Sequence, residues 1–224
     1  MGNKVCLSHL IRQDSPSYGG RDHIFIRTNS SIKKGETSNT SCWFFSNNHI
    51  GTHIDVPFHF SDTGKKTFEI PIHHFFFYNP QLIDIPCNEP RLIVPKDFES
   101  ILTINQDADL ILIRTGFEKY RTEDRYWNAN PGLAPELADY LRVRFPRLRC
   151  VGFDFISLTS WKYRDIGREC HKAFLCPNHG EKEILVIEDM ALAKIESSLK
   201  MVIVAPLFVE DGNGGAVTVI AELV

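Results

Sequence analysis

Metal-competent side chains gather in one short segment of the sequence, with histidine at positions 49, 53 and 59 and aspartate at position 55. Imidazole and carboxylate together suit Zn²⁺, Mn²⁺ or a similar borderline divalent cation. A helix is disfavoured here, because the segment contains Gly51, the β-branched residues Thr52, Ile54 and Val56, and then Pro57. On an extended chain alternate side chains share a face, so we expect His53, Asp55 and His59 to lie on one side.

The same alternation sends apolar side chains to the opposite face, where we expect them to enter the core: Ile54, Val56, Phe58 and Phe60. A turn at Gly51 would bring His49 to the polar face as well. A single histidine is usually just a hydrogen-bonded residue. Three histidines and one aspartate set against an apolar face instead predict a divalent metal site.

A mononuclear site needs no more than His49, His53 and Asp55, whereas a fuller site needs ligands from elsewhere in the chain. The downstream candidates are His171, His179, Glu188 and Asp189. The glutamate follows an apolar strand, where an ionisable group is rare without a partner or a metal. The neighbouring aspartate has an alternative role, which is to cap a helix beginning near Met190.

A divalent ion held at this cluster would lower the pKa of a bound water to roughly 7 and polarise a carbonyl group. The amine leaving group then needs a proton, and an unligated imidazole is suited to supply it. We expect His59 to play this part, with a role as a further metal ligand as the competing interpretation. Ser157 and Ser160 lack the sequence context of a serine nucleophile.

The composition limits the classes of partner. The chain has 224 residues and a formal net charge of -3, and its basic residues form no stripe, so a nucleic-acid or anionic-membrane partner is not expected. No apolar stretch is long enough to span a bilayer, and six scattered cysteines without a CxxC pair suit reduced thiols. These features favour a cytoplasmic protein. Aromatic residues either line a substrate pocket or belong to the core, namely Trp43, Phe44, Phe45 and Trp161.

Continuous apolar runs predict buried strands at residues 110–114, 150–155, 184–187, 201–205 and 216–221. Helices are expected at residues 135–145, 95–102 and 191–198. Strands and helices therefore alternate in the C-terminal two-thirds, while the N-terminal third has more turns and aromatic residues and is expected to be β-rich. The pattern predicts one α/β domain over residues 1–224.

The stretch from His49 to His59 resembles the HxGTHxDxPxH motif of the cyclase-like metal-dependent hydrolase family, which includes bacterial kynurenine formamidases and isatin hydrolases. Other segments also resemble the family, over nearly the whole chain: residues 7–9, 16–20, 112–117, 130–133, 152–158, and 211–212 followed by 217–221. The resemblance implies a swivelling β/β/α domain with a mixed β-sheet core. It also implies a homodimer or higher homo-oligomer.

Residue roles follow from the same resemblance. His49, His53 and Asp55 match the ligands of the first metal, and His59 matches the proton donor and acceptor. His171 matches the histidine that binds a second metal and Glu188 matches an acidic metal ligand at the end of a strand, so one or two divalent ions per subunit are implied. Residues 176–183 look like a small insertion that brings in His179, which leaves the choice between His171 and His179 open.

The leading functional interpretation is hydrolysis of a non-peptide C–N bond in a small-molecule amide, either an aryl formamide or a cyclic amide. Metal-assisted cyclisation or dehydration is the alternative within enzymes. A non-catalytic metal-binding or ligand-binding protein of the same fold is the alternative outside them. The sequence does not identify the substrate.

Overall fold

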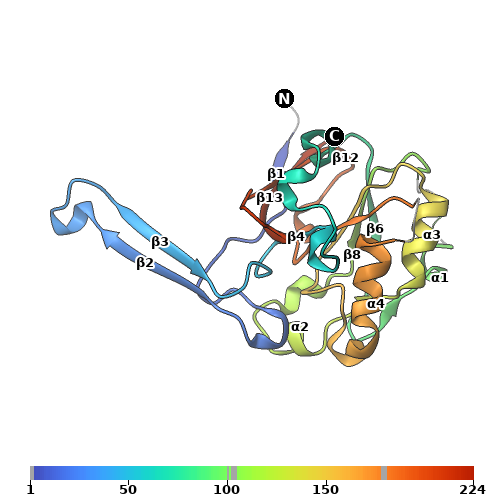
Figure 1. Ribbon diagram of the computed structural model, residues 1–224, viewed down its shortest axis with the longest axis horizontal. Coiled ribbons are helices and arrows are strands. Elements are labelled where there is room, and N and C mark those ends of the chain that lie inside the picture. Colours follow the sequence, from blue (N-terminus) through green and yellow to red (C-terminus); the bar gives the residue numbers. More distant parts are fainter. Residues whose placement is uncertain (1–2, 100, 102–104, 178–180) are drawn as a thin grey trace.

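The computed structural model describes residues 3–99, 101, 105–177 and 181–224. Within these residues a nine-stranded sheet forms the body, in the order β5-β12-β13-β4-β11-β10-β8-β6, with β1 pairing with β13 (Figure 1). Its strands are β1 (Lys4–Cys6), β4 (His53–Asp55), β5 (Phe76–Phe77), β6 (Pro80–Asp84), β8 (Leu110–Arg114), β10 (Cys150–Phe153), β11 (Leu185–Glu188), β12 (Leu199–Pro206) and β13 (Gly214–Leu223). The sheet is mixed, because β6, β8, β10 and β11 run parallel and β4 runs antiparallel to β11 and β13.

All five strands predicted from apolar runs are present, as β8, β10, β11, β12 and β13. Three of them lie in the parallel part of the sheet and are buried on both faces, which is why they read as continuous apolar segments. The β-rich N-terminal third is also confirmed. Two smaller pairs complete the strands, namely β2 (Ile24–Ser30) with β3 (Thr40–Phe45) and β7 (Leu92–Ile93) with β9 (Gly132–Leu133).

Four α-helices are present in the described residues, α1 (Lys96–Glu99), α2 (Arg125–Asn128), α3 (Glu136–Arg144) and α4 (Arg164–Leu175). The two longer helices pack on one face of the sheet, where Leu137 and Phe174 join a core with Ile111 and Val151 (Figure 1). Alternate strand residues such as Leu112 enter a second core on the other face. The sheet therefore separates two apolar layers.

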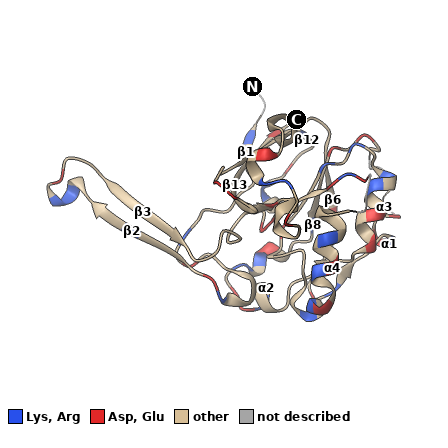
Figure 2. Cartoon of the chain, in the orientation of Figure 1, with Lys and Arg blue, Asp and Glu red and all other residues tan. Residues whose placement is uncertain are grey.

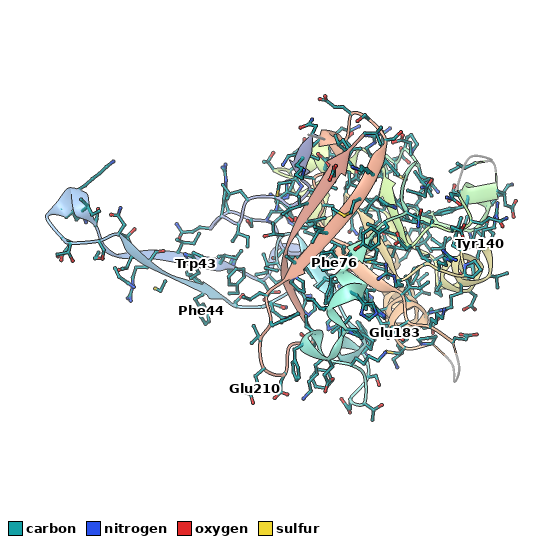
Figure 3. All side chains as sticks on the ribbon, turned by 90° about the horizontal axis from the view of Figure 1, so that it is seen from above. Trp43, Phe44, Phe76, Tyr140, Glu183 and Glu210 are labelled. Atoms are coloured by element: carbon teal, nitrogen blue, oxygen red, sulfur yellow. The ribbon has the colours of Figure 1, made fainter. Side chains whose placement is uncertain are left out.

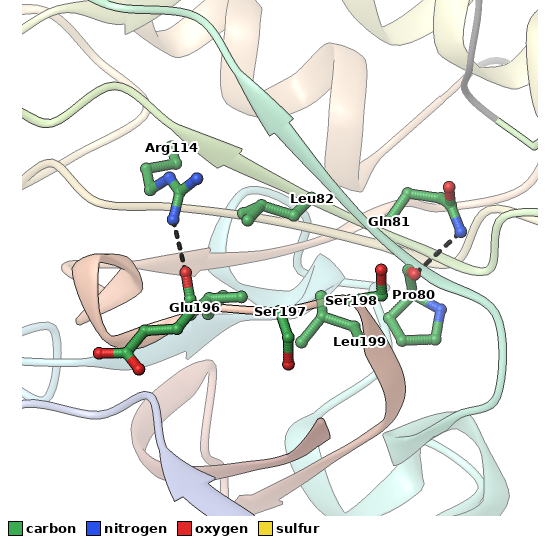
Figure 4. Close-up of a pocket in the computed structure, with 9 residues that line it drawn as sticks. Pro80, Gln81, Leu82, Arg114, Glu196, Ser197, Ser198 and Leu199 are labelled. Atoms are coloured by element: carbon green, nitrogen blue, oxygen red, sulfur yellow. Dashed lines mark hydrogen bonds between the residues drawn. The ribbon is translucent and has the colours of Figure 1, made fainter. Parts of the chain in front are cut away.

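The sheet curls until its edge strand β6 approaches β12, which is next to the other edge strand β5, without pairing with it. A pocket of about 380 Å³ lies in this gap, lined by Pro80–Leu82, Arg114 and residues 195–199 (Figure 4). Arg114 spans the gap by donating a hydrogen bond from Nη1 to the carbonyl oxygen of Ile195 over 2.8 Å. The sheet is thus nearly closed, and side-chain contacts take the place of a final strand ladder.

The helix predictions had mixed outcomes. The helix at 135–145 is confirmed as α3, and that at 95–102 is present as α1, with residues 100 and 102 outside the described part. The helix predicted at 191–198 is wrong, because that segment forms only a 3₁₀ turn at Leu192–Lys194. Its backbone groups bond elsewhere, since the Ala191 amide donates to Leu7 and the Ile195 carbonyl accepts from Arg114. Helix α4 was not predicted.

Strands β2 and β3 form a hairpin arm that projects far from the body (Figure 1). Its side chains are almost all exposed between residues 25 and 44. No helix among the described residues has the length and apolar character needed to cross a bilayer.

Candidate metal centre

The local fold of the histidine–aspartate segment brings ligands from separate strands together. Gly51 adopts a left-handed conformation, with φ of 74°, and this turn places His49 beside the strand that follows, as expected. His53 and Asp55 then occupy the two ends of β4. Because β4 runs antiparallel to β11, His53 lies directly opposite Glu188. The sheet register therefore joins two candidate ligands that are 135 positions apart in sequence.

The extended chain predicted as far as His59 ends at Val56, so that prediction is wrong for residues 57–59. Pro57–His59 forms a 3₁₀ turn, closed by a hydrogen bond from the His59 amide to the Val56 carbonyl. Proline at the first position of this turn suits its fixed φ. The turn still directs the His59 ring to the site. It also carries Phe60 away from the core that Ile54 and Val56 join; Phe60 packs partly buried against the other core, and its ring stacks on His171 with the centroids 4.6 Å apart.

Two buried histidines present lone pairs to two buried carboxylates. The Nδ1 atom of His53 lies 2.8 Å from the Gly51 carbonyl oxygen, and that of His171 lies 2.8 Å from the Gly167 carbonyl oxygen. A carbonyl oxygen only accepts, so each Nδ1 carries the proton, which leaves Nε2 as a lone pair in the neutral ring. The buried Nε2 of His53 has no hydrogen-bond partner among the described residues.

Both lone pairs lie near Asp55 and Glu188. His53 Nε2 is 3.4 Å from Glu188 Oε2 and 3.6 Å from Asp55 Oδ1. His171 Nε2 is 3.7 Å from Asp55 Oδ2 and from Glu188 Oε1. Lone pairs and carboxylate oxygens repel one another unless a cation or a proton lies between them. This donor set of nitrogen and oxygen atoms fits a divalent cation.

The pKa values of these groups reflect the crowding of charge. Burial would raise the pKa of Asp55, but the adjacent His49 holds it well below its usual range. Burial and Asp55 would both raise the pKa of Glu188, yet His171 and His53 lower it. Burial would lower the pKa of His53, but Glu188 and Asp55 raise it to about 9. In the metal-free protein, both carboxylates are therefore ionised at neutral pH, and His53 carries a second proton, on Nε2, in place of a metal ion.

His49 and His59 form the outer side of the site. The His49 Nδ1 atom lies 2.7 Å from Asp55 Oδ1, and its ring stacks on that of His59 with the centroids 4.0 Å apart. Ligand-competent atoms thus fall into two compact groups that share the aspartate, His49–Asp55–His59 and His53–Asp55–Glu188. Burial lowers the pKa of His59 to about 4.

These groups line a pocket of about 190 Å³ that also contains residues not singled out from the sequence: Arg21, Asp22, Asn47, Ile156 and Thr159. Tyr18 lines it too, and its ring packs edge-on against Trp161, with the centroids 5.1 Å apart. Trp161 therefore supports the pocket wall through Tyr18. Trp43 and Phe44 lie on the arm and are exposed, so they belong neither to this pocket nor to the core.

The two open questions about downstream ligands have different outcomes. His171 lies in α4 and reaches the site, whereas His179 lies outside the described residues. Asp189 caps no helix, and that prediction is wrong. Its fully buried carboxylate accepts two hydrogen bonds from Arg121, at 2.8 and 2.7 Å, and one from Tyr126 at 2.5 Å.

The hydrogen bonds of Asp189 to Arg121 and Tyr126 fix the chain next to Glu188. Asp189 has a φ of 53°, and its carbonyl oxygen accepts a hydrogen bond from the hydroxyl of Thr52, which precedes His53. The Thr52 side chain therefore links the segment that carries His53 to the segment that carries Glu188. Sequence reasoning missed Arg121 and Tyr126, because only the fold brings them to Asp189.

The chain is similar in sequence to proteins of a known family. Residues 5–159 match the family described as "Putative cyclase", and the chain belongs to that family. A kynurenine formamidase of Bacillus cytotoxicus is 27% identical over 173 residues, which are 77% of this chain and 75% of that protein. An uncharacterised protein of Haemophilus influenzae is 36% identical over 110 residues, which are 48% of this chain and 78% of that protein.

Solved structures of similar fold cover nearly the whole chain. Isatin hydrolase A from Labrenzia aggregata has a TM-score of 0.80 at 22% identity, covering 99% of this chain and 93% of that chain. Isatin hydrolase A from Ralstonia solanacearum has a TM-score of 0.82 at 17% identity, covering 99% and 92%. These similarities confirm the mixed α/β fold implied by the sequence resemblance.

Proposed function

We propose that the protein is a metal-dependent hydrolase of a non-peptide C–N bond in a small-molecule amide, of the aryl formamide or cyclic amide type. The observation that carries the proposal is the pair of buried Nε2 atoms, on His53 and His171, that face Asp55 and Glu188 inside a pocket. The named relatives, a kynurenine formamidase and isatin hydrolases, support the choice of substrate class.

The residues present fit one or two divalent ions, for which Zn²⁺ and Mn²⁺ are the candidates. His49, His53 and Asp55 would hold the first ion, and His171 and Glu188 would hold a second, with Asp55 between the two. A bound divalent ion supplies a Lewis acid and a water whose pKa falls to about 7. The orientation of two of these histidines supports the arrangement, since His53 and His171 each have a backbone carbonyl beside Nδ1, which leaves Nε2 as the atom for the metal.

His59 is the proposed group for proton transfer. Its lowered pKa keeps the imidazole neutral at neutral pH. It can therefore accept a proton from the water that attacks the carbonyl carbon of the substrate. The same nitrogen then returns the proton to the departing amine. Stacking on His49 fixes the orientation of the ring and keeps it beside the ligand cluster. Residues 1–224 act as one domain in this proposal, because both cores share the same sheet.

The test combines metal analysis with turnover of N-formylkynurenine and isatin in ¹⁸O-labelled water. Hydrolysis predicts bound metal, turnover of at least one compound, and one labelled oxygen in the acid product. A cyclase or dehydratase would form product without incorporating label. Full metal occupancy without turnover of any amide or lactam in a broad panel would favour the non-catalytic binding protein instead.

A further inference from the structure

His49 is held at the metal centre by a side chain from a distant loop. Its Nε2 atom lies 3.2 Å from Oδ1 of Asn213, and its Nδ1 atom lies 2.7 Å from Oδ1 of Asp55. Asn213 belongs to the loop that leads into β13, whereas His49 belongs to the segment that precedes β4. Figure 3 shows this loop at the edge of the body, where its Glu210 is labelled. The contact joins residues that are 164 positions apart in the sequence.

The groups around Asn213 determine which of its side-chain atoms faces His49. The carbonyl oxygen of Gly214 only accepts hydrogen bonds, so the Asn48 side chain, 3.0 Å away, presents its Nδ2 amide group to it. The same Nδ2 group lies 2.7 Å from the Asn213 side chain. Because an amide nitrogen only donates, the Asn213 atom beside it is the oxygen. That oxygen has a second lone pair, which accepts a hydrogen bond from Nε2 of His49.

This hydrogen bond decides which nitrogen of His49 is available to a metal ion. A neutral imidazole has one N–H group, so a hydrogen on Nε2 leaves the lone pair on Nδ1. Nδ1 faces Asp55 within the group of ligand-competent atoms that also includes His59. The order is reversed in His53 and His171, where Nδ1 faces a backbone carbonyl and Nε2 is the available atom. Hydrogen bonding therefore selects opposite ring nitrogens in different ligands of one centre.

The backbone next to Asn213 is shaped to lie against the His49 ring. Gly214 has a φ of 151°, which residues with a side chain rarely adopt. A Cβ atom at Gly214 would lie 2.5 Å from the carbonyl oxygen of Ile54 and 2.8 Å from Cε1 of His49. Gly214 also pairs with Asp55 in the register of β13 and β4. The missing side chain therefore lets the loop approach the ring closely enough for the Asn213 hydrogen bond.

The group that orients His49 adds no charge to the centre. Residues 212–221 have no charged side chain, so most of β13 is tan in Figure 2. Asp55 and Glu188 already supply two negative charges, which balance the charge of one divalent ion. The amide oxygen of Asn213 is a neutral acceptor. It can therefore fix the ring without disturbing this balance.

We propose that Asn213 is the positioning residue for His49, and that His49 binds the first divalent ion through Nδ1 while His53 binds it through Nε2. The inference rests on the metal binding in the proposed function and not on the hydrolysis. The amide oxygen keeps the hydrogen on Nε2 and holds the ring so that Nδ1 stays beside Asp55. Asn213 lies outside the lining of the metal pocket, so it acts through His49 alone. Hydrogen bonds of this kind typically contribute about 10–100-fold to metal affinity.

A crystal structure of the zinc-loaded full chain tests which nitrogen binds the ion. We expect Nδ1 of His49 and Nε2 of His53 at the zinc, with the hydrogen bond from His49 to Asn213 retained. Coordination through Nε2 of His49, or a zinc ion with His49 turned away, would overturn the inference and leave the proposed hydrolysis standing. A chain that coordinates zinc as expected but turns over no amide would contradict the hydrolysis alone. A chain that binds no zinc would overturn both.

Zinc affinity, measured by competition with a chelator, tests the role of the Asn213 oxygen. Asn213→Ala should bind zinc about 10–100-fold more weakly than the wild type. Asn213→Asp keeps an oxygen acceptor at this position, so we expect it to recover most of that loss and to retain coordination through Nδ1. Asn88→Ala is the matched control, because Asn88 is exposed and its side-chain oxygen accepts a hydrogen bond from Lys119. Wild-type affinity in Asn213→Ala, or no recovery in Asn213→Asp, would contradict the positioning role.

Discussion

Removing the Arg121 side chain should strongly destabilise the protein although Arg121 lies outside the metal cluster. Arg121 is the bidentate partner of Asp189, whose carboxylate is fully buried, and Arg121 itself is only 17% exposed. Arg121→Met keeps most of the side-chain volume but leaves a buried carboxylate with Tyr126 as its remaining donor. Breaking a buried pair in this way costs about 3–5 kcal/mol.

The companion substitution separates lost charge pairing from lost packing. Asp189→Asn removes the negative charge and tolerates the left-handed conformation, with φ of 53°, better than most residues. The double variant, Arg121→Met with Asp189→Asn, has no unpaired buried charge at this position. It should therefore be more stable than Arg121→Met alone by about 2 kcal/mol or more. Adding a second substitution is thus expected to recover stability.

The assay is urea unfolding of each variant with a chelator present, so that metal binding does not contribute to the free energy of unfolding. The affinity for metal is then measured separately, because Asp189 directly follows Glu188. We expect both stability and metal affinity to fall in Arg121→Met. A loss under about 1 kcal/mol, or a double variant as unstable as the sum of the single ones, would refute the reasoning.

Three further predictions concern the metal cluster. Replacing His53 and Asp55 together with Ala should abolish metal binding. Stoichiometric metal in that variant would contradict the site. His73→Ala is the control, because His73 lies on the exposed surface. His59→Ala should keep its metal and lose about 10²–10⁴-fold in turnover, with a smaller loss for substrates that have good leaving groups. Loss of metal in that variant would make His59 a ligand. The pKa of His53 is about 9 in the metal-free protein, so a metal ion must displace the second proton of this ring at any pH below that value. The apparent metal affinity should therefore rise about tenfold per pH unit between pH 6 and 8. The affinity is measured by competition with a chelator, and a flat pH profile would show that metal displaces no proton.

The order of residues in the sequence determined much of the metal centre. The spacing of His49, His53 and Asp55 around Gly51 is local, so a single turn and a short strand place these three side chains together. Continuous apolar runs identified the buried strands for a similar reason. Strands covered on both faces must be apolar throughout, whatever their neighbours are.

The alternation predicted through His59 failed where the chain left the strand, because period-two reasoning holds only while the backbone stays extended. The helix predicted after Met190 failed because distant groups accept and donate the hydrogen bonds that a helix would need. Local propensity is weaker than such tertiary contacts. Helix α4 was not predicted from the sequence. Its buried residues lie on the side that packs against the core.

The remaining ligands and their supports were decided by the tertiary structure. Glu188 meets His53 because β11 and β4 are paired in one register, and His171 arrives on a helix packed against that strand. Arg121 and Tyr126 reach Asp189 from a loop and a short helix that carry no motif. Such contacts join residues far apart in the chain, and a sequence pattern encodes only what neighbouring residues do to one another.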